Sequence, residues 1–174
     1  WLHSFNIHSS KESWHSSYEI STNLRQHSQS LSTWKASTFL SLDGLKNLSP
    51  KECKALSTWD GEHLYLNGLK SISAESACAL AEWQGSLLEL NGLKSISAVK
   101  MQAISCWEGL HLSINGIKFL SIKSAKELSR WQGNVVNLDG IKSLSVDSAL
   151  ALSEWHGNIL NLNGIQSLST NEAM

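Results

Sequence analysis

Apolar and polar residues alternate in short stretches that recur along this chain at a constant interval. Residues 64–66, 88–90 and 136–138 each read apolar, polar, apolar. This alternation places two apolar side chains on one face and a polar one on the other, as in a short, half-buried strand. The interval between stretches is a multiple of 24 residues, so the pattern predicts one strand in each copy of a 24-residue repeat.

Residues 40–174 consist of five full copies of this repeat and a partial sixth, with no insertion or deletion between them. The copies begin at Leu40, Leu64, Leu88, Leu112, Val136 and Leu160. A period of this length is typical of a solenoid, a propeller or an array. Because one such unit cannot bury its apolar face alone, we expect successive units to stack on one another.

A turn is predicted directly after each strand. An Asn-Gly or Asp-Gly pair, such as Asn67-Gly68, occupies this position in all six copies, and both residue types tolerate a positive φ. Such a pair often joins the two strands of a hairpin, but no second alternating stretch follows it here. Parallel stacking of the strands is therefore the favoured interpretation.

A short helix is predicted in the second half of each copy. Ser73 and its equivalents precede helix-forming residues, as N-cap residues do, and the only proline, Pro50, takes the first helical position after Ser49. A tryptophan such as Trp83 follows the last apolar position of the helix, and Gly85 comes two residues later. We expect these glycines to end the helices in a left-handed conformation.

The predicted fold class is therefore α/β, a curved parallel β/α solenoid. Parallel strands lie about 4.8 Å apart, whereas packed helices prefer roughly 8–10 Å. This mismatch bends the stack, so strands are expected on the concave side and short helices on the convex side.

The chain resembles leucine-rich repeat proteins, in particular the bacterial variants, over about residues 40–174. The shared features are the Leu-x-Leu strand of residues 64–66 and its equivalents, the 24-residue period, and the later apolar residue at Ile72 and its equivalents. The chain has Gly61 where the family pattern has a leucine, and Leu69 where that pattern has its ladder asparagine. No asparagine ladder is therefore expected, and the resemblance implies the fold and a binding role.

The two ends of the chain differ from the regular copies. Residues 1–39 are interpreted as degenerate repeats that form an N-terminal cap, because Leu31-Ser32-Thr33-Trp34 matches residues 56–59. At the other end, copy six stops after the start of its helix. We expect that the native chain continues beyond residue 174 or that a partner covers this edge.

Composition narrows the function classes. The formal net charge is −1, which favours neither nucleic acid nor membrane partners, and no apolar run is long enough for a membrane span. Three cysteines are too few for a disulfide framework, and they do not indicate in which cellular compartment the protein works. Cys53 is expected to be buried, and Cys78 and Cys106 are expected to be exposed. The chain has no metal-ligand spacing, phosphate loop or nucleophile motif, so we expect neither an enzyme nor a cofactor.

The polar strand positions vary from copy to copy while the frame stays constant, which is typical of a recognition surface. With the two histidines placed just before their strands, the candidate partner-binding residues are Ser41, His63, Tyr65, Glu89, His111, Ser113, Asn137 and Asn161. The other interpretation is neutral variation on a solvated face.

One lysine per copy forms a second candidate site. Lys46, Lys70, Lys94, Lys118 and Lys142 should line up as a stripe of like charges that ends at Gln166. The stripe could bind an acidic protein segment or a polysaccharide. It could equally keep the turn edge soluble, balanced by Asp43 and Asp139.

The tryptophans are expected to pack between neighbouring helices, with each indole N–H donating to a backbone carbonyl.

Two functional hypotheses remain. The first is a non-enzymatic scaffold, part of a larger protein, that binds a protein or glycan on its concave strand face. The second is a structural protein whose copies join end to end into a filament.

Overall fold

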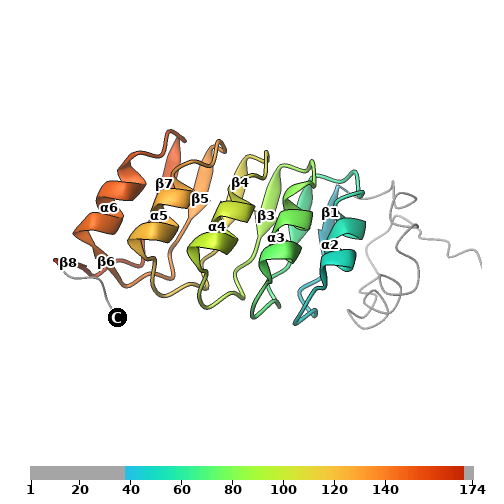
Figure 1. Cartoon of the computed structure of the whole chain (residues 1–174), viewed down its shortest axis with the longest axis horizontal. Helices are drawn as coiled ribbons and strands as arrows, with labels where there is room; N and C mark the ends of the chain where they lie inside the picture. Colours follow the sequence, from blue (N-terminus) through green and yellow to red (C-terminus); the bar gives the residue numbers. More distant parts are fainter. Residues whose placement is uncertain (1–37, 171–174) are drawn as a thin grey trace, which may run out of the picture.

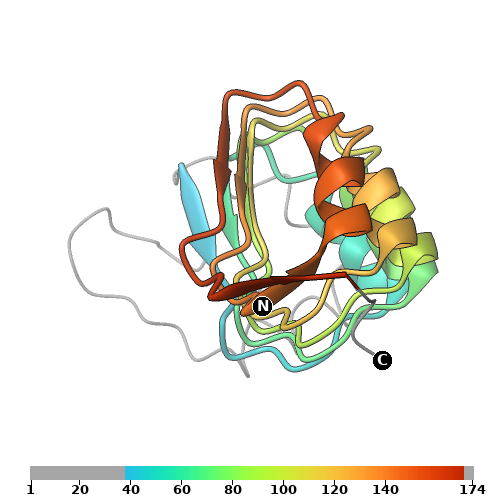
Figure 2. The ribbon, with the colours of Figure 1, turned by 90° about the vertical axis from the view of Figure 1, so that its left-hand side faces the viewer.

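The computed structural model describes residues 38–170 of the 174-residue chain. Six strands form one parallel sheet, and five helices lie on one side of it (Figures 1 and 2). The strands are β1 (Phe39–Ser41), β2 (His63–Tyr65), β3 (Leu87–Glu89), β4 (His111–Ser113), β5 (Val135–Asn137) and β7 (Ile159–Asn161). The helices are α2 (Pro50–Leu56), α3 (Ala74–Ala81), α4 (Ala98–Ile104), α5 (Ile122–Leu128) and α6 (Val146–Ser153).

Neighbouring strands pair in parallel with a constant offset of 24 residues. Leu64 pairs with Leu40 on one side and with Leu88 on the other, and the same register continues to β7. Each helix packs against the helix of the next copy. The predicted α/β class and parallel pairing are confirmed, and the arrangement is consistent with a stack of β/α coils. The predicted cap at residues 1–39 lies almost entirely outside the described residues.

The strands begin one residue earlier than the alternation predicts. In β2 the middle residue, Leu64, is buried, and His63 and Tyr65 are partly exposed on the opposite face. The N–H of Leu66, just after the strand, still donates to the carbonyl of Glu89 at 2.8 Å. The ladder therefore spans residues 63–66, and both leucines of the predicted strand remain in the core.

The predicted serine N-caps are present at the start of all five helices. Ser49 accepts a hydrogen bond from the N–H of Glu52, whose carboxylate in turn accepts from the N–H of Ser49, which forms a capping box. The Ser73 hydroxyl accepts from the N–H of Ser76 at 3.0 Å. Ser97 occupies the same position without a side-chain cap bond.

The helices end before the glycines that were expected to end them. Each described helix has seven or eight residues, and the C-cap residue of α3, Glu82, has φ −77°. Gly85 has no positive φ; instead, a Cβ atom on it would lie 1.9 Å from the ring of Trp83. The left-handed C′ prediction was therefore wrong, because the helix already ends at the right-handed C-cap Glu82. The glycine is required instead because the Trp83 ring leaves no room for a side chain.

The tryptophans form a continuous stack after the helix ends rather than between helices. Rings of successive copies, from Trp59 to Trp155, have centroids 5.8–6.2 Å apart and planes within 9° of parallel. The indole N–H of Trp83 donates to the carbonyl of Trp59 at 3.0 Å, and the N–H groups of Trp131 and Trp155 make the same bond. The expected carbonyl bonds are thus confirmed in these three copies.

An Asn/Asp ladder joins the coils, contrary to expectation. The N–H of Asn91 donates to the side-chain oxygen of Asn67 in the preceding copy at 3.1 Å, and the N–H of Asn115 to that of Asn91 at 2.8 Å. Asp43 and Asp139 accept the equivalent bonds. The ladder uses the residue before the glycine of the turn, two positions earlier than the column at Leu69 where the family pattern predicts it.

Two further features were not anticipated. Buried serines join three of the helices, α3, α5 and α6, to the copy before each: the hydroxyl of Ser76 donates to the carbonyl of Leu48 at 2.9 Å, and Ser124 and Ser148 repeat the bond. A second parallel sheet pairs β6 (Ser143–Ser145) with β8 (Ser167–Ser169) below the helices (Figure 2).

Candidate functional site

The exposed face of the six-stranded sheet, which we call the strand face, carries two rows of side chains. Each strand contributes its first and third residues to this face, because its middle residue points into the core. The first row contains Phe39, His63, Leu87, His111, Val135 and Ile159. The second row contains Ser41, Tyr65, Glu89, Ser113, Asn137 and Asn161.

The strand pairing brings all the predicted partner-binding residues onto this one face. His63 and His111 were expected just before their strands. Each is instead the first residue of its strand, so His63 lies on the same surface as Tyr65, and His111 on the same surface as Ser113. Ser113 is only 2% exposed, so its prediction as a contact residue was wrong. Its small side chain lies beneath its polar neighbours and supports them.

The apolar members of the first row were not predicted from the sequence. Phe39 is 58% and Ile159 49% exposed, and Leu87 and Val135 are half-buried between them. They share the column of His63 and His111, so extending the apolar-polar pattern one residue toward the N-terminus would have revealed them. The strand face therefore combines a first row of four apolar residues and two histidines with a polar second row.

The polar row is held by hydrogen bonds that link it to the Asn/Asp ladder. The carboxylate of Glu89 accepts from the side-chain amides of Asn67 at 2.8 Å and Asn91 at 3.2 Å. The Ser113 hydroxyl donates to Asn91 at 2.8 Å and accepts from Asn115 at 3.2 Å. These hydrogen bonds hold the side chains of Glu89 and Ser113 in fixed orientations.

His111 belongs to a second hydrogen-bonded group. The amide of Asn161 donates to the side-chain oxygen of Asn137 at 2.6 Å, and the amide nitrogen of Asn137 lies 2.8 Å from Nε2 of His111. This orientation of Asn137 suits a neutral imidazole that accepts at Nε2. Burial lowers the pKa of His111, Glu89 partly opposes the shift, and His63 adds to it.

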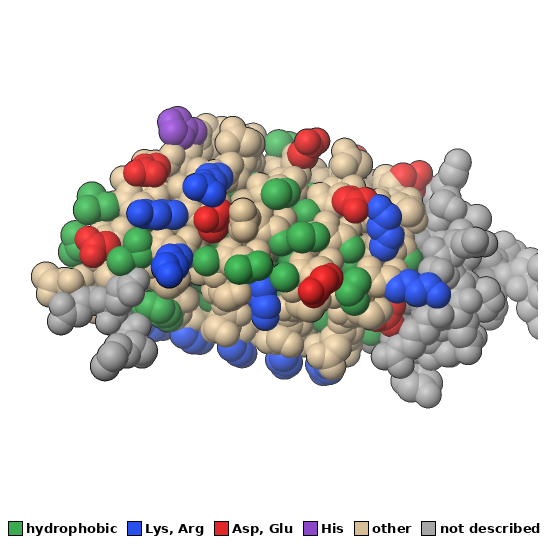
Figure 3. All heavy atoms as spheres, in the orientation of Figure 1, with side chains coloured by type: hydrophobic (Ala, Val, Ile, Leu, Met, Phe, Trp, Pro, Cys, Tyr) green, Lys and Arg blue, Asp and Glu red, His purple; other side chains and the backbone are tan. Residues whose placement is uncertain are grey.

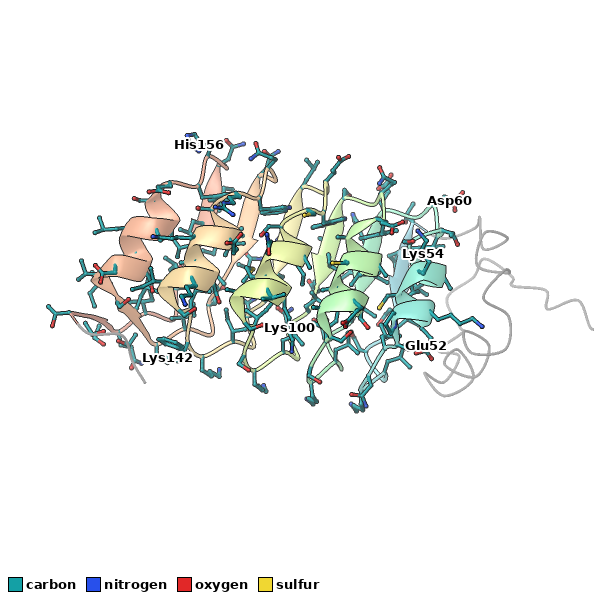
Figure 4. All side chains as sticks on the ribbon, in the orientation of Figure 1. Glu52, Lys54, Asp60, Lys100, Lys142 and His156 are labelled. Atoms are coloured by element: carbon teal, nitrogen blue, oxygen red, sulfur yellow. The ribbon has the colours of Figure 1, made fainter. Side chains whose placement is uncertain are left out.

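The predicted lysine stripe is aligned along one edge of the molecule, and we call it the lysine row. All five members, Lys46, Lys70, Lys94, Lys118 and Lys142, are exposed. Figure 3 shows Lys and Arg side chains in a line along the lower edge, where Figure 4 labels Lys142. The row follows the turn after each strand and is separate from the strand face.

The last described copy exposes residues that the other copies bury. Trp155, Leu160 and Ile165 are only partly buried, although the equivalent residues one copy earlier are at most 1% exposed. Leu168 is 64% exposed, against 2% for Leu144. Within residues 38–170, β7 and β8 each pair on one side only. This surface, which we call the C-terminal edge, is apolar.

Among residues 38–170, no cluster of three or more His, Cys, Asp or Glu side chains could hold a metal ion. None of the helices in this range combines the length and apolar character of a membrane span. Cys53 is buried, and Cys78 and Cys106 are exposed, as predicted. Burial raises the pKa of Cys53 to about 12.

Comparisons with protein-family models, with curated proteins and with solved structures find no match to this chain. The function of this chain is therefore inferred from its own surfaces.

Proposed function

We propose that this chain is a non-enzymatic binding scaffold of the leucine-rich repeat kind, curved with its strands on the concave side. The constant 24-residue register and the helices packed copy against copy support this architecture. Wider spacing of helices than of strands would produce the curvature.

The proposed partner is a protein or a glycan that binds to the strand face. The observation that carries this proposal is that the strand face presents both rows of side chains on one surface. Exposed Phe39 and Ile159 offer apolar contact, which favours a protein. Tyr65, Glu89 and Asn137 offer aromatic and hydrogen-bonding groups beside them. The side chains of the strand face differ from copy to copy, whereas the backbone that carries them repeats. Such a face can be specific for one partner while its shape stays constant.

The test compares two matched double variants for binding to partners captured by the immobilised chain and on a glycan array. Y65A/E89A changes the strand face, and Q102A/K126A changes exposed residues of the helices. A true partner loses at least about tenfold in affinity with the first variant only. Thermal melts confirm that both variants fold. If every captured partner binds both variants equally, the strand face is not the binding site.

A second candidate function, end-to-end self-association, is supported by the C-terminal edge. Within residues 38–170 the helices of successive copies pack against one another, and we infer that a second chain packs against the C-terminal edge in the same way. Such a contact does not close and would form a filament. Light scattering against concentration tests it: rods that lengthen for the wild type and shorten for L168K support it, and a monomer at all concentrations contradicts it.

A further inference from the structure

The lysine row contains one exposed lysine in each of the five full copies of the repeat. The N–H of Lys70 donates to the carbonyl of Lys46 at 3.3 Å, and the N–H of Gln166 donates to that of Lys142 at 2.8 Å. Backbones joined in this way lie about 4.8 Å apart. The row therefore presents one ammonium group per coil, close enough for mutual repulsion.

The carboxylates nearest in sequence do not pair with these lysines. Asp43 and Asp139 lie three residues before Lys46 and Lys142, but each directs a side-chain oxygen to a backbone N–H of the next copy, at 2.7 and 2.8 Å. Within residues 38–170, no ion pair involves a member of the row. Asp43 and Asp139 therefore do not neutralise the lysine row by direct ion pairs, contrary to expectation.

The three central lysines carry the least compensated charge. Lys70, Lys94 and Lys118 follow ladder asparagines rather than aspartates. The acidic side chains Asp60, Glu62 and Glu108 follow the helix ends instead, and Figure 4 labels Asp60 at the edge opposite Lys142. The lysine row is therefore a positive edge on a molecule whose net charge is −1.

The chemistry of the row suits a linear polyanion with evenly spaced charges. Lysine is a point charge without the planar fork that selects individual carboxylates or phosphates, so the row responds to charge and its spacing. Exposed Ser71 and Ser95 follow Lys70 and Lys94 directly and provide hydroxyls for hydrogen bonds. We propose that the lysine row binds an anionic polysaccharide lying along the stack, at a site separate from the strand face.

The experiment measures binding of the full chain to polygalacturonate and to dextran sulfate at low and physiological salt. The central triple variant K70Q/K94Q/K118Q removes three charges from the row. The control K51Q/K123Q/K126Q removes three exposed charges from α2 and α5. We expect the central variant to bind both polymers at least about tenfold more weakly, and the control to bind them nearly as well as the wild type. Added salt should weaken wild-type binding steeply.

Four outcomes would overturn the proposal. They are no binding of either anionic polymer at low salt, equal loss in the two variants, equal binding of neutral dextran, and tighter binding of poly-L-glutamate, which would indicate an acidic protein instead. The variant Y65A/E89A should retain polysaccharide binding, so failure of the strand-face proposal and failure of this one are distinguishable.

Discussion

Trp83 both stacks on Trp59, with ring centroids 5.8 Å apart, and donates its indole N–H to the backbone carbonyl of Trp59 at 3.0 Å. The ring is fully buried, so it joins two coils by packing and by a hydrogen bond at once. Replacing it with alanine should lower the free energy of unfolding by about 3–5 kcal/mol. The variant W83F keeps an aromatic ring and should lose less. Urea unfolding measures both, and equal loss would mean that stacking contributes little.

The Asn/Asp ladder predicts a contrast between two substitutions of Asn115. Its side-chain oxygen accepts from the N–H of Asp139 at 2.8 Å. N115A leaves that N–H without its partner and should cost about 1–3 kcal/mol of stability. N115D keeps an acceptor oxygen, as Asp43 does, and should cost less. Unfolding curves that rank the two variants in the reverse order would contradict the ladder's role.

Gly92 is predicted to resist substitution for lack of space. A Cβ atom on it would lie 2.2 Å from the carbonyl oxygen of Asn67 and 2.3 Å from that of Leu69. Since neither backbone atom is at the free end of a side chain, G92A should cost about 1–3 kcal/mol or more. The control S95A changes an exposed residue of the same turn and should stay within about 0.5 kcal/mol of the wild type by thermal melting.

His111 should make the fold sensitive to mild acid. Its pKa is lowered in the folded chain, chiefly by burial, so the folded state favours the neutral ring. The stability this provides is complete above the unfolded pKa of about 6.5 and is lost as the pH falls below that value toward the folded pKa. Protonation also removes the acceptor that faces Asn137.

The measurement compares urea midpoints between pH 7.5 and 5 for H111Q and for the control H156Q, which changes an exposed histidine. H111Q should flatten the pH dependence, and H156Q should leave it close to that of the wild type. An unchanged slope in H111Q would show that His111 does not contribute.

The three cysteines should report on folding by their reactivity. Cys53 is buried and its pKa is raised to about 12, whereas Cys78 and Cys106 are exposed. Because the thiolate is the reactive form, iodoacetamide at pH 8 should label Cys78 and Cys106 in the folded chain and Cys53 only after unfolding. Mass spectrometry of digested samples measures this; rapid labelling of Cys53 at low denaturant would mean that α2 opens locally.

The repeat pattern alone was enough to predict which residues form the core and how the coils follow one another. Leu64 and Leu66 alternate with a polar residue, and Ser73 precedes a helix, because burial and capping depend on near neighbours in sequence. The exposure of Cys78 and the burial of Cys53 followed from the same columns. For these features, a correct interpretation of one copy predicts all the other copies.

The tertiary structure decided what happens between copies. Only contact between copies brings the Asn67 side chain to the N–H of Asn91, stacks the Trp83 ring on that of Trp59, and places Ser113 beneath its neighbours. Each of these contacts joins residues about one copy apart or depends on the path of the backbone after a helix, which no local pattern encodes. The sequence by itself therefore determined the strand, turn and helix of each copy, and contact between copies decided which polar side chains join the copies and which stay exposed.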